Sequence, residues 1–277
     1  MSKKIFIEEC AEIIKKITAK KPLVHHITNY VTVNDCANIT LAIGASPIMA
    51  DAIEEVQEIV SISSSLVLNI GTLNERTVKS MIAAGKKANE INIPVILDPV
   101  GAGASSLRNN TTKDILDKVK INILRGNISE IRYIAGLNAD TKGVDASEKD
   151  LNSYSEAAEI AYNLAKKQKC VVAITGAVDI VSDGARTVYI ENGHKALSNI
   201  TGTGCMCSSL VGSFNGAAPE MPLHATVSAL LCMGIAGEIA YEKAGNIGNG
   251  SYRSAIIDAI SNIDANTLLE RSKFYEK

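Results

Sequence analysis

The feature that most constrains this chain is a series of short apolar runs separated by longer helical patterns. Strands are predicted at residues 23–27, 47–50, 66–70, 94–98, 121–125 and 170–176. Helices are predicted between them at 33–43, 53–62, 74–91, 112–119 and 155–168. Strands separated by helices of this kind imply right-handed crossovers and a parallel sheet. We therefore expect an α/β fold of three layers (αβα), with a mostly parallel central sheet flanked by helices on both faces.

The composition agrees with this architecture and extends it to the whole chain. Aromatic residues make up only 4% and Trp is absent, so Ile, Val, Leu and Ala must build the core, as they do in buried parallel strands. No break in composition divides the 277 residues, which predicts a single domain at 1–277. The remaining pattern predicts helices at 5–19, 226–244 and 252–263, and a hairpin of residues 179–182 and 187–191 around Asp183 and Gly184.

Polar or distinctive residues follow many of these strands. Because parallel strands end at the same edge of a sheet, and ligands bind beyond that edge, such residues are expected to share one cleft. The candidates are Asn29, Met49, Asn69, Asp98, Arg125, Thr175 and the turn at Gly202.

The turn at residues 201–205, Thr-Gly-Thr-Gly-Cys, precedes a long run of small and apolar residues and is predicted to open a buried helix. The first backbone N–H groups of a helix have no internal partner, so phosphate can dock there. Gly202 and Gly204 lack the Cβ atoms that would hold a phosphate away, and Thr203 can cap the turn or donate a hydroxyl. Cys205 would lie on the first turn beside the bound anion. The alternative at this point is a glycine-rich turn that only leads into a packed helix.

Charge and cysteine content exclude several classes of function. A formal net charge of −2 offers no basic stripe for nucleic acid. Six scattered cysteines form neither a disulfide framework nor a zinc-binding pattern. No signal peptide and no run of roughly 20 apolar residues is present, so we expect a soluble cytoplasmic protein with no membrane partner.

The sequence lacks the standard nucleotide-binding signatures G-x-x-x-x-G-K-[ST] and G-x-G-x-x-G, which disfavours a dehydrogenase. Phosphoryl transfer instead needs positive charge at the phosphate, Mg²⁺ held by carboxylates, and a group that orients the attacking hydroxyl. Asp98 and Glu130 each follow a strand and are candidate magnesium ligands, and Arg125 is a candidate for gripping phosphate.

These residues carry a resemblance to a known family. Gly202–Cys205 resembles the anion-hole motif of ribokinase-like kinases, in which G-x-G precedes the base, and Asn127–Glu130 resembles their N-x-x-E magnesium motif. More narrowly, the chain is similar to hydroxyethylthiazole kinases over about residues 21–240. The matching runs, in order, are HHITNYV at 25–31, GASPIMA at 44–50, NIGTL at 69–73, DPVGA at 98–102 and RGN at 125–127.

The resemblance implies a ribokinase-like fold without a lid domain and ATP-dependent phosphorylation of 4-methyl-5-(2-hydroxyethyl)thiazole, a salvage step of thiamine biosynthesis. It also implies a homotrimer with active sites at subunit interfaces. By position, Met49, Gly202 and Asn29 would contact the thiazole alcohol, Arg125 and Thr175 would contact ATP, and Asp98 and Glu130 would serve Mg²⁺. Residues 202–205 would form the anion hole, and Cys205 would take the place of the catalytic base. Cysteine departs from the aspartate of the wider superfamily but fits the thiazole kinases, and we interpret Cys205 as orienting the hydroxyl or accepting its proton late.

Other interpretations stay open on the sequence alone. Met49 can be a core residue, Asp98 a turn former, Glu130 a favourable acid at a helix start, and Thr175 a simple strand end. The fold also suits a kinase for another alcohol such as a pyridine, an ATP-dependent dehydratase of hydrated nicotinamide nucleotides, or a nucleotide sensor without turnover.

Overall fold

One nine-stranded sheet organises the computed structural model, which describes residues 3–137 and 149–277. The strand order is β2-β1-β3-β4-β5-β6-β7-β8-β9. Pairing is parallel from β2 to β6 and antiparallel from β6 to β9. The strands are β1 Leu23–Ile27, β2 Ser46–Met49, β3 Ser65–Asn69, β4 Val95–Asp98, β5 Ile123–Asn127, β6 Val171–Thr175, β7 Asp179–Ser182, β8 Thr187–Ile190 and β9 Phe274–Glu276.

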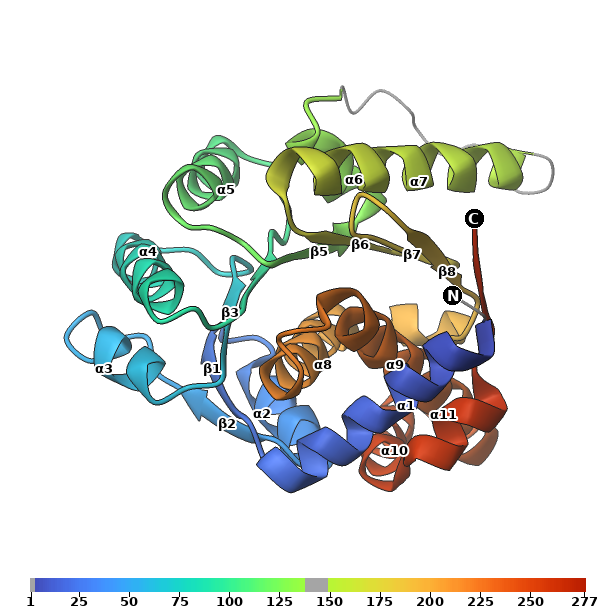
Figure 1. Ribbon diagram of the computed structural model, residues 1–277. Coiled ribbons are helices and arrows are strands. Elements are labelled where there is room, and N and C mark those ends of the chain that lie inside the picture. The colour runs from blue at the N-terminus through green and yellow to red at the C-terminus, as the bar shows by residue number, and fades with distance from the viewer. Residues whose placement is uncertain (1–2, 138–148) are drawn as a thin grey trace.

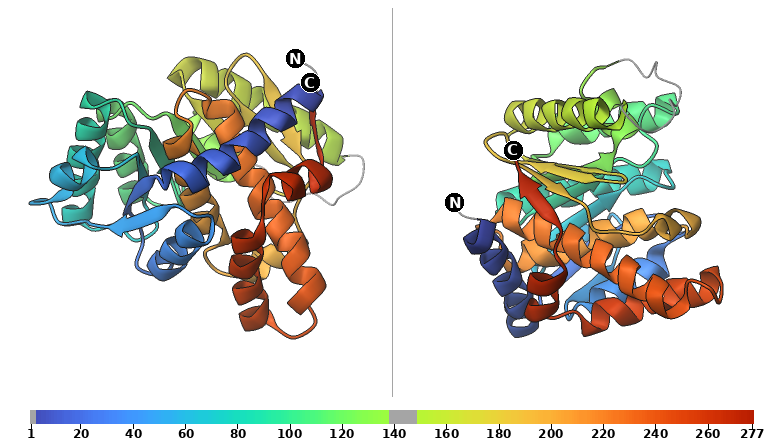
Figure 2. Two further views of the ribbon diagram at one scale, coloured as in Figure 1. Left: turned by 60° about the horizontal axis from the view of Figure 1, so that its bottom comes forward. Right: turned by 90° about the vertical axis from the view of Figure 1, so that its right-hand side faces the viewer.

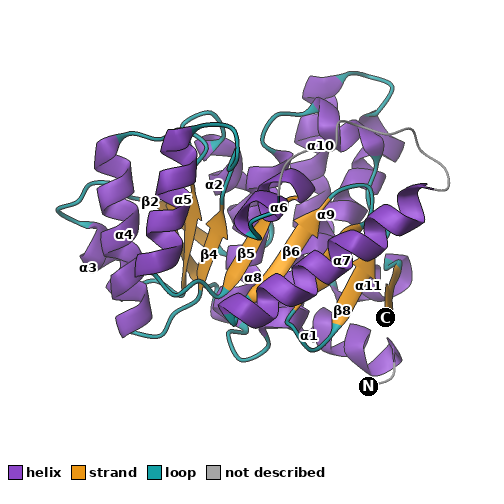
Figure 3. Cartoon of the chain, turned by 90° about the horizontal axis from the view of Figure 1, so that it is seen from above, coloured by secondary structure: helices purple, strands orange, loops and turns teal. Residues whose placement is uncertain are grey.

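Helices cover both faces of the sheet, as Figures 1 and 3 show. One face carries α3 Val56–Ser61, α4 Glu75–Glu90, α5 Ser106–Lys118, α6 Ile128–Ile134 and α7 Lys149–Gln168. The other carries α1 Lys3–Lys20, α2 Val33–Ala42, α8 Thr203–Ala217, α9 Pro222–Ala244, α10 Asn249–Asn262 and α11 Ala265–Arg271. The predicted three-layer α/β architecture is therefore confirmed.

Two hydrophobic cores, one on each face, follow from the alternation of side chains along the strands. Val67 of β3 packs into the core with α1, α2, α8, α9 and α10, whereas its neighbours Leu66 and Leu68 pack into the core with α3 to α7. Successive strand residues point to opposite faces, so a continuous apolar run serves both layers at once. This is the physical reason why a strand such as β3 reads as a continuous run of Leu and Val.

Helix α8 lies directly on the sheet, and α9 packs against α8. Both are buried around most of their circumference. Helix α9 is long and apolar enough to cross a bilayer by length and composition alone, but 89% of its most apolar window is buried inside the fold. It is therefore a core helix, and it covers the predicted helix at 226–244.

Several element boundaries differ from the sequence prediction. Helix α5 begins at Ser106 because Ser105 caps it by accepting a hydrogen bond from the Arg108 N–H at 3.3 Å. Pro222 begins α9 four residues before the predicted start, since proline suits the first turn of a helix. The sequence prediction missed α11, β9 and the 3₁₀ turn η1 Lys195–Asn199.

The C-terminal segment was missed because its structure depends on distant residues. Strand β9 forms the edge of the sheet and pairs with β8, and Phe274 packs on Phe6 of α1 with ring centroids 5.7 Å apart. Figure 2 shows this segment lying beside α1. A three-residue strand has too short a pattern to be recognised without these partners.

Candidate active site

A cavity of about 750 Å³ lies at the carboxyl ends of β4, β5 and β6, between them and the start of α8. Of the predicted site residues, those on its wall are Asp98, Arg125, Glu130, Thr175, Gly202, Thr203, Gly204 and Cys205. The sheet register explains this convergence, since Asn69 is paired with Asp98 and Asn127 with Thr175 in neighbouring parallel strands. The predicted shared cleft is thus present for Asp98, Arg125, Thr175 and the turn at Gly202, whereas the other three candidates, Asn29, Met49 and Asn69, do not line it.

The start of α8 forms part of the cavity wall. Gly202 precedes the helix with a left-handed backbone (φ 92°), and no side chain caps it. A Cβ on Gly202 would lie 2.7 Å from Thr32 Cγ2, so both conformation and space require glycine there. The Thr203 hydroxyl donates away from the helix start, to the carbonyl oxygens of Leu197 and Ile200. The uncapped N–H groups of this turn are therefore the donors that the cavity offers to an anion.

The guanidinium group of Arg125 packs against this turn at Gly204. A Cβ on Gly204 would lie 2.9 Å from Arg125 Nη1, so the missing side chain makes the approach possible. Arg125 Nη2 donates to Thr175 Oγ1 at 2.7 Å, and Nη1 lies 3.6 Å from Asp98 Oδ2. Burial opposes the charged form, but Asp98 and other nearby acids outweigh it and raise the Arg125 pKa. A permanent positive charge thus stands beside the helix terminus, which suits phosphate binding.

Asp98 is almost fully buried, and its two oxygens have different environments. Oδ2 accepts hydrogen bonds from Asn69 Nδ2 at 2.9 Å and Ser208 Oγ at 2.8 Å. Oδ1 is buried and has no hydrogen-bond partner among the described residues. Burial raises the Asp98 pKa to about 6 despite the opposing effect of Arg125. An unpaired buried carboxylate oxygen is costly, which indicates that a ligand or water completes this site.

Glu130 lies on the first turn of α6, where it also stabilises the helix start. Its Oε2 accepts from the Asn127 N–H and its Oε1 from the Gly101 N–H, both at 2.8 Å. Together with Asn127 Oδ1, which accepts from the Glu130 N–H, this forms a capping box. The interpretation of Glu130 as a helix-start residue is therefore correct, and it faces the cavity as well. Each oxygen retains a lone pair for water or a cation.

These carboxylates fit Mg²⁺. The cation prefers oxygen ligands, keeps several waters, and is commonly held by one or two carboxylates together with substrate phosphates. Asp98 Oδ1 is buried without a hydrogen-bond partner among the described residues, and Glu130 lines the same cavity as Asp98. No cluster of three or more His, Cys, Asp or Glu side chains that could form an all-protein metal cage occurs in the described ranges.

Cys205 lies on the first turn of α8 and is half-buried, whereas the other five cysteines are buried. Its sulfur accepts hydrogen bonds from Asn29 Nδ2 and Asn69 Nδ2, each at 3.3 Å. Asn29 does not line the cavity itself but is held behind Cys205, with its Oδ1 accepting from the N–H and hydroxyl of Thr32. The structure therefore brings two predicted site residues, Asn29 and Cys205, into direct contact.

Met49 lies apart from these groups. It ends the edge strand β2 opposite His26, is half-buried, and does not line the cavity.

Other cavity residues were missed by sequence reasoning. Asp179 begins β7, and its Oδ1 accepts from the Gly176 N–H at 2.9 Å, while burial raises its pKa to about 7. Cys207 also lines the cavity, although burial raises its pKa to about 12. Val100 and Asn127 also line the cavity and belong to runs that carried the family resemblance. The remaining missed residues are Gly176, Ala177, Asn192–Lys195, Leu197, Ser198, Met233 and Gly234. No local motif marks these, and those near η1 and on α9 reach the strand ends only when η1 and α9 pack around the cavity.

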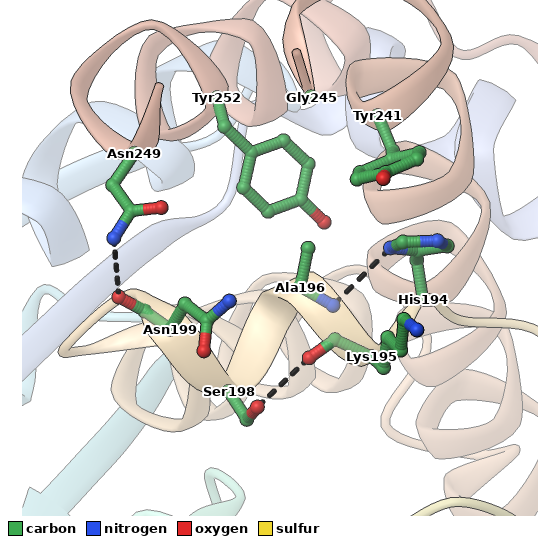
Figure 4. A pocket seen from close by; sticks show the side chains of 9 residues that line it. All are labelled: His194, Lys195, Ala196, Ser198, Asn199, Tyr241, Gly245, Asn249 and Tyr252. Carbon is green, nitrogen blue, oxygen red and sulfur yellow. Dashed lines mark hydrogen bonds between the residues drawn. The ribbon is translucent and has the colours of Figure 1, made fainter. Parts of the chain in front are cut away.

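The 3₁₀ turn η1 separates this cavity from a second one of about 320 Å³, shown in Figure 4. His194, Lys195 and Ser198 line both cavities. The His194 ring stacks on Tyr241 of α9, with centroids 3.6 Å apart, and its Nδ1 accepts from the Ala196 N–H. The wall between the two cavities is therefore the turn η1 with His194, and the stacking of His194 on Tyr241 of α9 holds it in place.

Comparison with known proteins decides the family. The sequence model of the hydroxyethylthiazole kinase family matches residues 14–266. The chain belongs to the hydroxyethylthiazole kinase family.

Individual relatives of the hydroxyethylthiazole kinase family agree over the full length. The hydroxyethylthiazole kinase of Clostridium beijerinckii is 61% identical over 277 residues, covering 100% of both chains. The solved structure of the hydroxyethylthiazole kinase protein from Pyrococcus horikoshii is 40% identical, with a TM-score of 0.88 over 98% of this chain and 99% of that one. A ribokinase-like superfamily protein from Enterococcus faecalis, only 9% identical, has a TM-score of 0.64 over 95% of this chain and 96% of that one, which confirms the ribokinase-like fold.

Proposed function

We propose that this chain transfers the γ-phosphoryl group of ATP to the primary alcohol of 4-methyl-5-(2-hydroxyethyl)thiazole, a salvage step of thiamine biosynthesis. One observation carries the proposal: the uncapped start of α8 faces a cavity beside Arg125 and two carboxylates. A nucleotide sensor would need the anion site but would leave the buried Asp98 and the adjacent Cys205 without a purpose. The full-length similarity to hydroxyethylthiazole kinases favours the thiazole alcohol over a pyridine alcohol or a nicotinamide nucleotide.

Each group then has a chemical task. The N–H groups of residues 203–205 and the Arg125 guanidinium stabilise the negative charge that spreads over the transferring phosphoryl oxygens. Thr175 holds the guanidinium in place through its 2.7 Å hydrogen bond and stands next to the nucleotide. Asp98 and Glu130 would hold Mg²⁺, which supplies charge neutralisation to the ATP phosphates when it is bound.

Cys205 receives the alcohol in this proposal. Its sulfur lies on the same helical turn as the anion hole, so a hydroxyl in contact with it can approach a phosphorus atom held there. The sulfur orients the hydroxyl or accepts its proton late in the transfer, when the oxygen becomes acidic. Asn29 lies against the sulfur, and Gly202 and Met49 are proposed to contact the thiazole ring.

We further propose a homotrimer in which a neighbouring subunit completes the thiazole side of each site. Exposed apolar side chains near Asn29 support an interface there: Tyr30 is 79% exposed and Val31 is 56% exposed. Light scattering coupled to gel filtration gives the mass directly, and a monomer mass would refute this part.

A cytoplasmic location is proposed because all six cysteines are free thiols, as expected of a protein in a reducing compartment.

The decisive experiment measures ADP release with Mg²⁺, ATP and 4-methyl-5-(2-hydroxyethyl)thiazole. The matched control is the same ring without its hydroxyl, and mass spectrometry identifies the phosphate ester. We expect turnover only with the alcohol and only with Mg²⁺. Equal ADP release from both rings would refute alcohol phosphorylation, and faster turnover of a pyridine alcohol would reassign the substrate.

A further inference from the structure

Asn69 is a buried polar residue to which neither the resemblance nor the proposed function gives a role. It ends β3, is 2% exposed, and does not line the cavity. Its side chain makes four hydrogen bonds. The Nδ2 atom donates to Asp98 Oδ2 at 2.9 Å and to Cys205 Sγ at 3.3 Å, while Oδ1 accepts from Gly71 N at 2.9 Å and Asn29 Nδ2 at 3.0 Å.

These contacts allow only one orientation of the amide. The Gly71 N–H can only donate, so the oxygen of Asn69 must face it, and the NH₂ group then points to Asp98 and Cys205. Asn29 is fixed in the same way, because its oxygen accepts from the Thr32 N–H. The Cys205 sulfur consequently accepts two N–H bonds from two oriented amides. Because both amides donate to the sulfur, a proton on the sulfur must point away from Asn29 and Asn69.

We propose that Asn69 is a positioning residue that joins the Cys205 sulfur and the Asp98 carboxylate in one hydrogen-bonded unit beneath the anion hole. This inference rests on the proposed function, in which Cys205 meets the alcohol and Asp98 serves Mg²⁺. The Asn69 NH₂ group contacts both residues. It donates to Asp98 Oδ2, while Oδ1 stays without a partner among the described residues, and its bond to the sulfur stabilises negative charge there. Asn69 thereby fixes the place of the alcohol relative to that of the phosphoryl group.

Three other ionisable groups near the sulfur can also affect its reactivity, so the experiment must leave them unchanged. Cys36 of α2 and Asp98 of β4 are acidic groups near Cys205, and Arg125 of β5 packs against the adjacent Gly204. All three remain in an Asn69 variant, so a change in thiol reactivity reports the loss of the amide.

The experiment compares Asn69→Ala with Asn122→Ala. Asn122 is a matched control, since its side chain also bonds a backbone group, accepting from Val95 N at 2.9 Å, but it precedes β5 at the opposite edge of the sheet. For Asn69→Ala we expect kcat to fall about tenfold, the effect of one hydrogen bond to a reacting group, with KM for ATP within about twofold. Asn122→Ala should keep the wild-type kcat.

A second readout does not depend on kinase activity. Iodoacetamide alkylation of Cys205, the one half-buried thiol among the six cysteines, is followed by peptide mass spectrometry without nucleotide or metal. At pH 7.5 we expect the rate constant to fall about 3- to 10-fold in Asn69→Ala, because a lost donor destabilises the thiolate. If thiazole phosphorylation itself is absent, this measurement still decides whether Asn69 acts on the sulfur.

A double-mutant cycle separates positioning from a general structural role. In the Cys205→Ser background, Asn69→Ala should change kcat much less than it does in the wild type, because the two residues act together. If Asn69→Ala does not fold, Asn69→Ser carries the same measurements, since its shorter side chain cannot bridge Asp98 and Cys205 and adds no charge beside them. Additive effects on kcat, or wild-type alkylation rates in a folded variant, would overturn the proposal.

Discussion

Replacing Gly204 with alanine tests whether Arg125 and the start of α8 act together on the nucleotide. The new Cβ would lie 2.9 Å from Arg125 Nη1 and 3.3 Å from Nη2. Normal contacts between such atoms are near 3.5 Å or longer, so the guanidinium must move by about 0.5–1 Å. The group is the far end of a flexible side chain, and it can move away, but its 2.7 Å bond to Thr175 Oγ1 lengthens.

The expected magnitude follows from the hydrogen bonds that the displaced guanidinium no longer makes well. Hydrogen bonds to charged groups contribute about 1.5–3 kcal/mol, so kcat/KM for ATP should fall roughly 10- to 100-fold. The free energy of unfolding should instead stay the same or rise, because alanine favours a helix over glycine by about 1 kcal/mol. For a chain of this size that corresponds to a Tm unchanged or higher by about 2–4 °C.

Steady-state kinetics with varied ATP, together with thermal unfolding, provide the assay, and Gly212→Ala is the matched control in the same helix. A Cβ on Gly212 would lie 2.5 Å from Val67 Cγ2 in the core between α8 and β3, and Val67 cannot leave its packed layer. Overpacking of this kind costs about 1–3 kcal/mol and should lower Tm by about 2–10 °C, with a smaller effect on kcat/KM. The reasoning is refuted if Gly204→Ala keeps kcat/KM for ATP within twofold of the wild type, or if its activity falls only in step with Tm.

Three further predictions address the remaining groups. Cys205→Ser should lower kcat at least about tenfold, because a serine hydroxyl does not ionise near neutral pH and cannot accept the proton as an anion, as a thiolate can; full kcat with an unchanged pH profile would show that Cys205 has no such role. Met49→Ala should raise KM for the thiazole alcohol about tenfold and leave KM for ATP nearly unchanged, by loss of apolar contact; equal changes in both constants would contradict it. Burial raises the Asp179 pKa to about 7, so this carboxyl ionises as the pH rises from 6 to 8. It then adds negative charge to the cavity in which the ATP phosphates are proposed to bind. KM for ATP should therefore increase over this range about threefold more in the wild type than in Asp179→Asn, which keeps an oxygen for the Gly176 N–H; parallel profiles would exclude Asp179 as the cause.

Much of the fold could be predicted because its signals are local. The strand around Val95–Asp98 is an apolar run closed by an aspartate, and the hairpin of β7 and β8 has Asp-Gly at its turn. Helix ends were less predictable, since the extent of α5 depends on the Ser105 cap and that of α9 on Pro222. Strand β9 depends on pairing with β8, which lies more than 80 residues earlier in the chain.

The sequence by itself determined the architecture, the edge of the sheet at which the cavity lies, and the glycines at the uncapped start of α8. These features follow from side-chain alternation, from the common end of parallel strands, and from the missing Cβ atoms at Gly202 and Gly204.

Only the tertiary structure decided which atoms face one another. Asn29, Asn69 and Cys205 lie far apart in the sequence, and their amide and thiol orientations are fixed by backbone groups that meet only after packing. The raised pKa values of Asp98 and Asp179 likewise arise from burial by surrounding elements, and burial is a property of the assembled fold that no single segment carries.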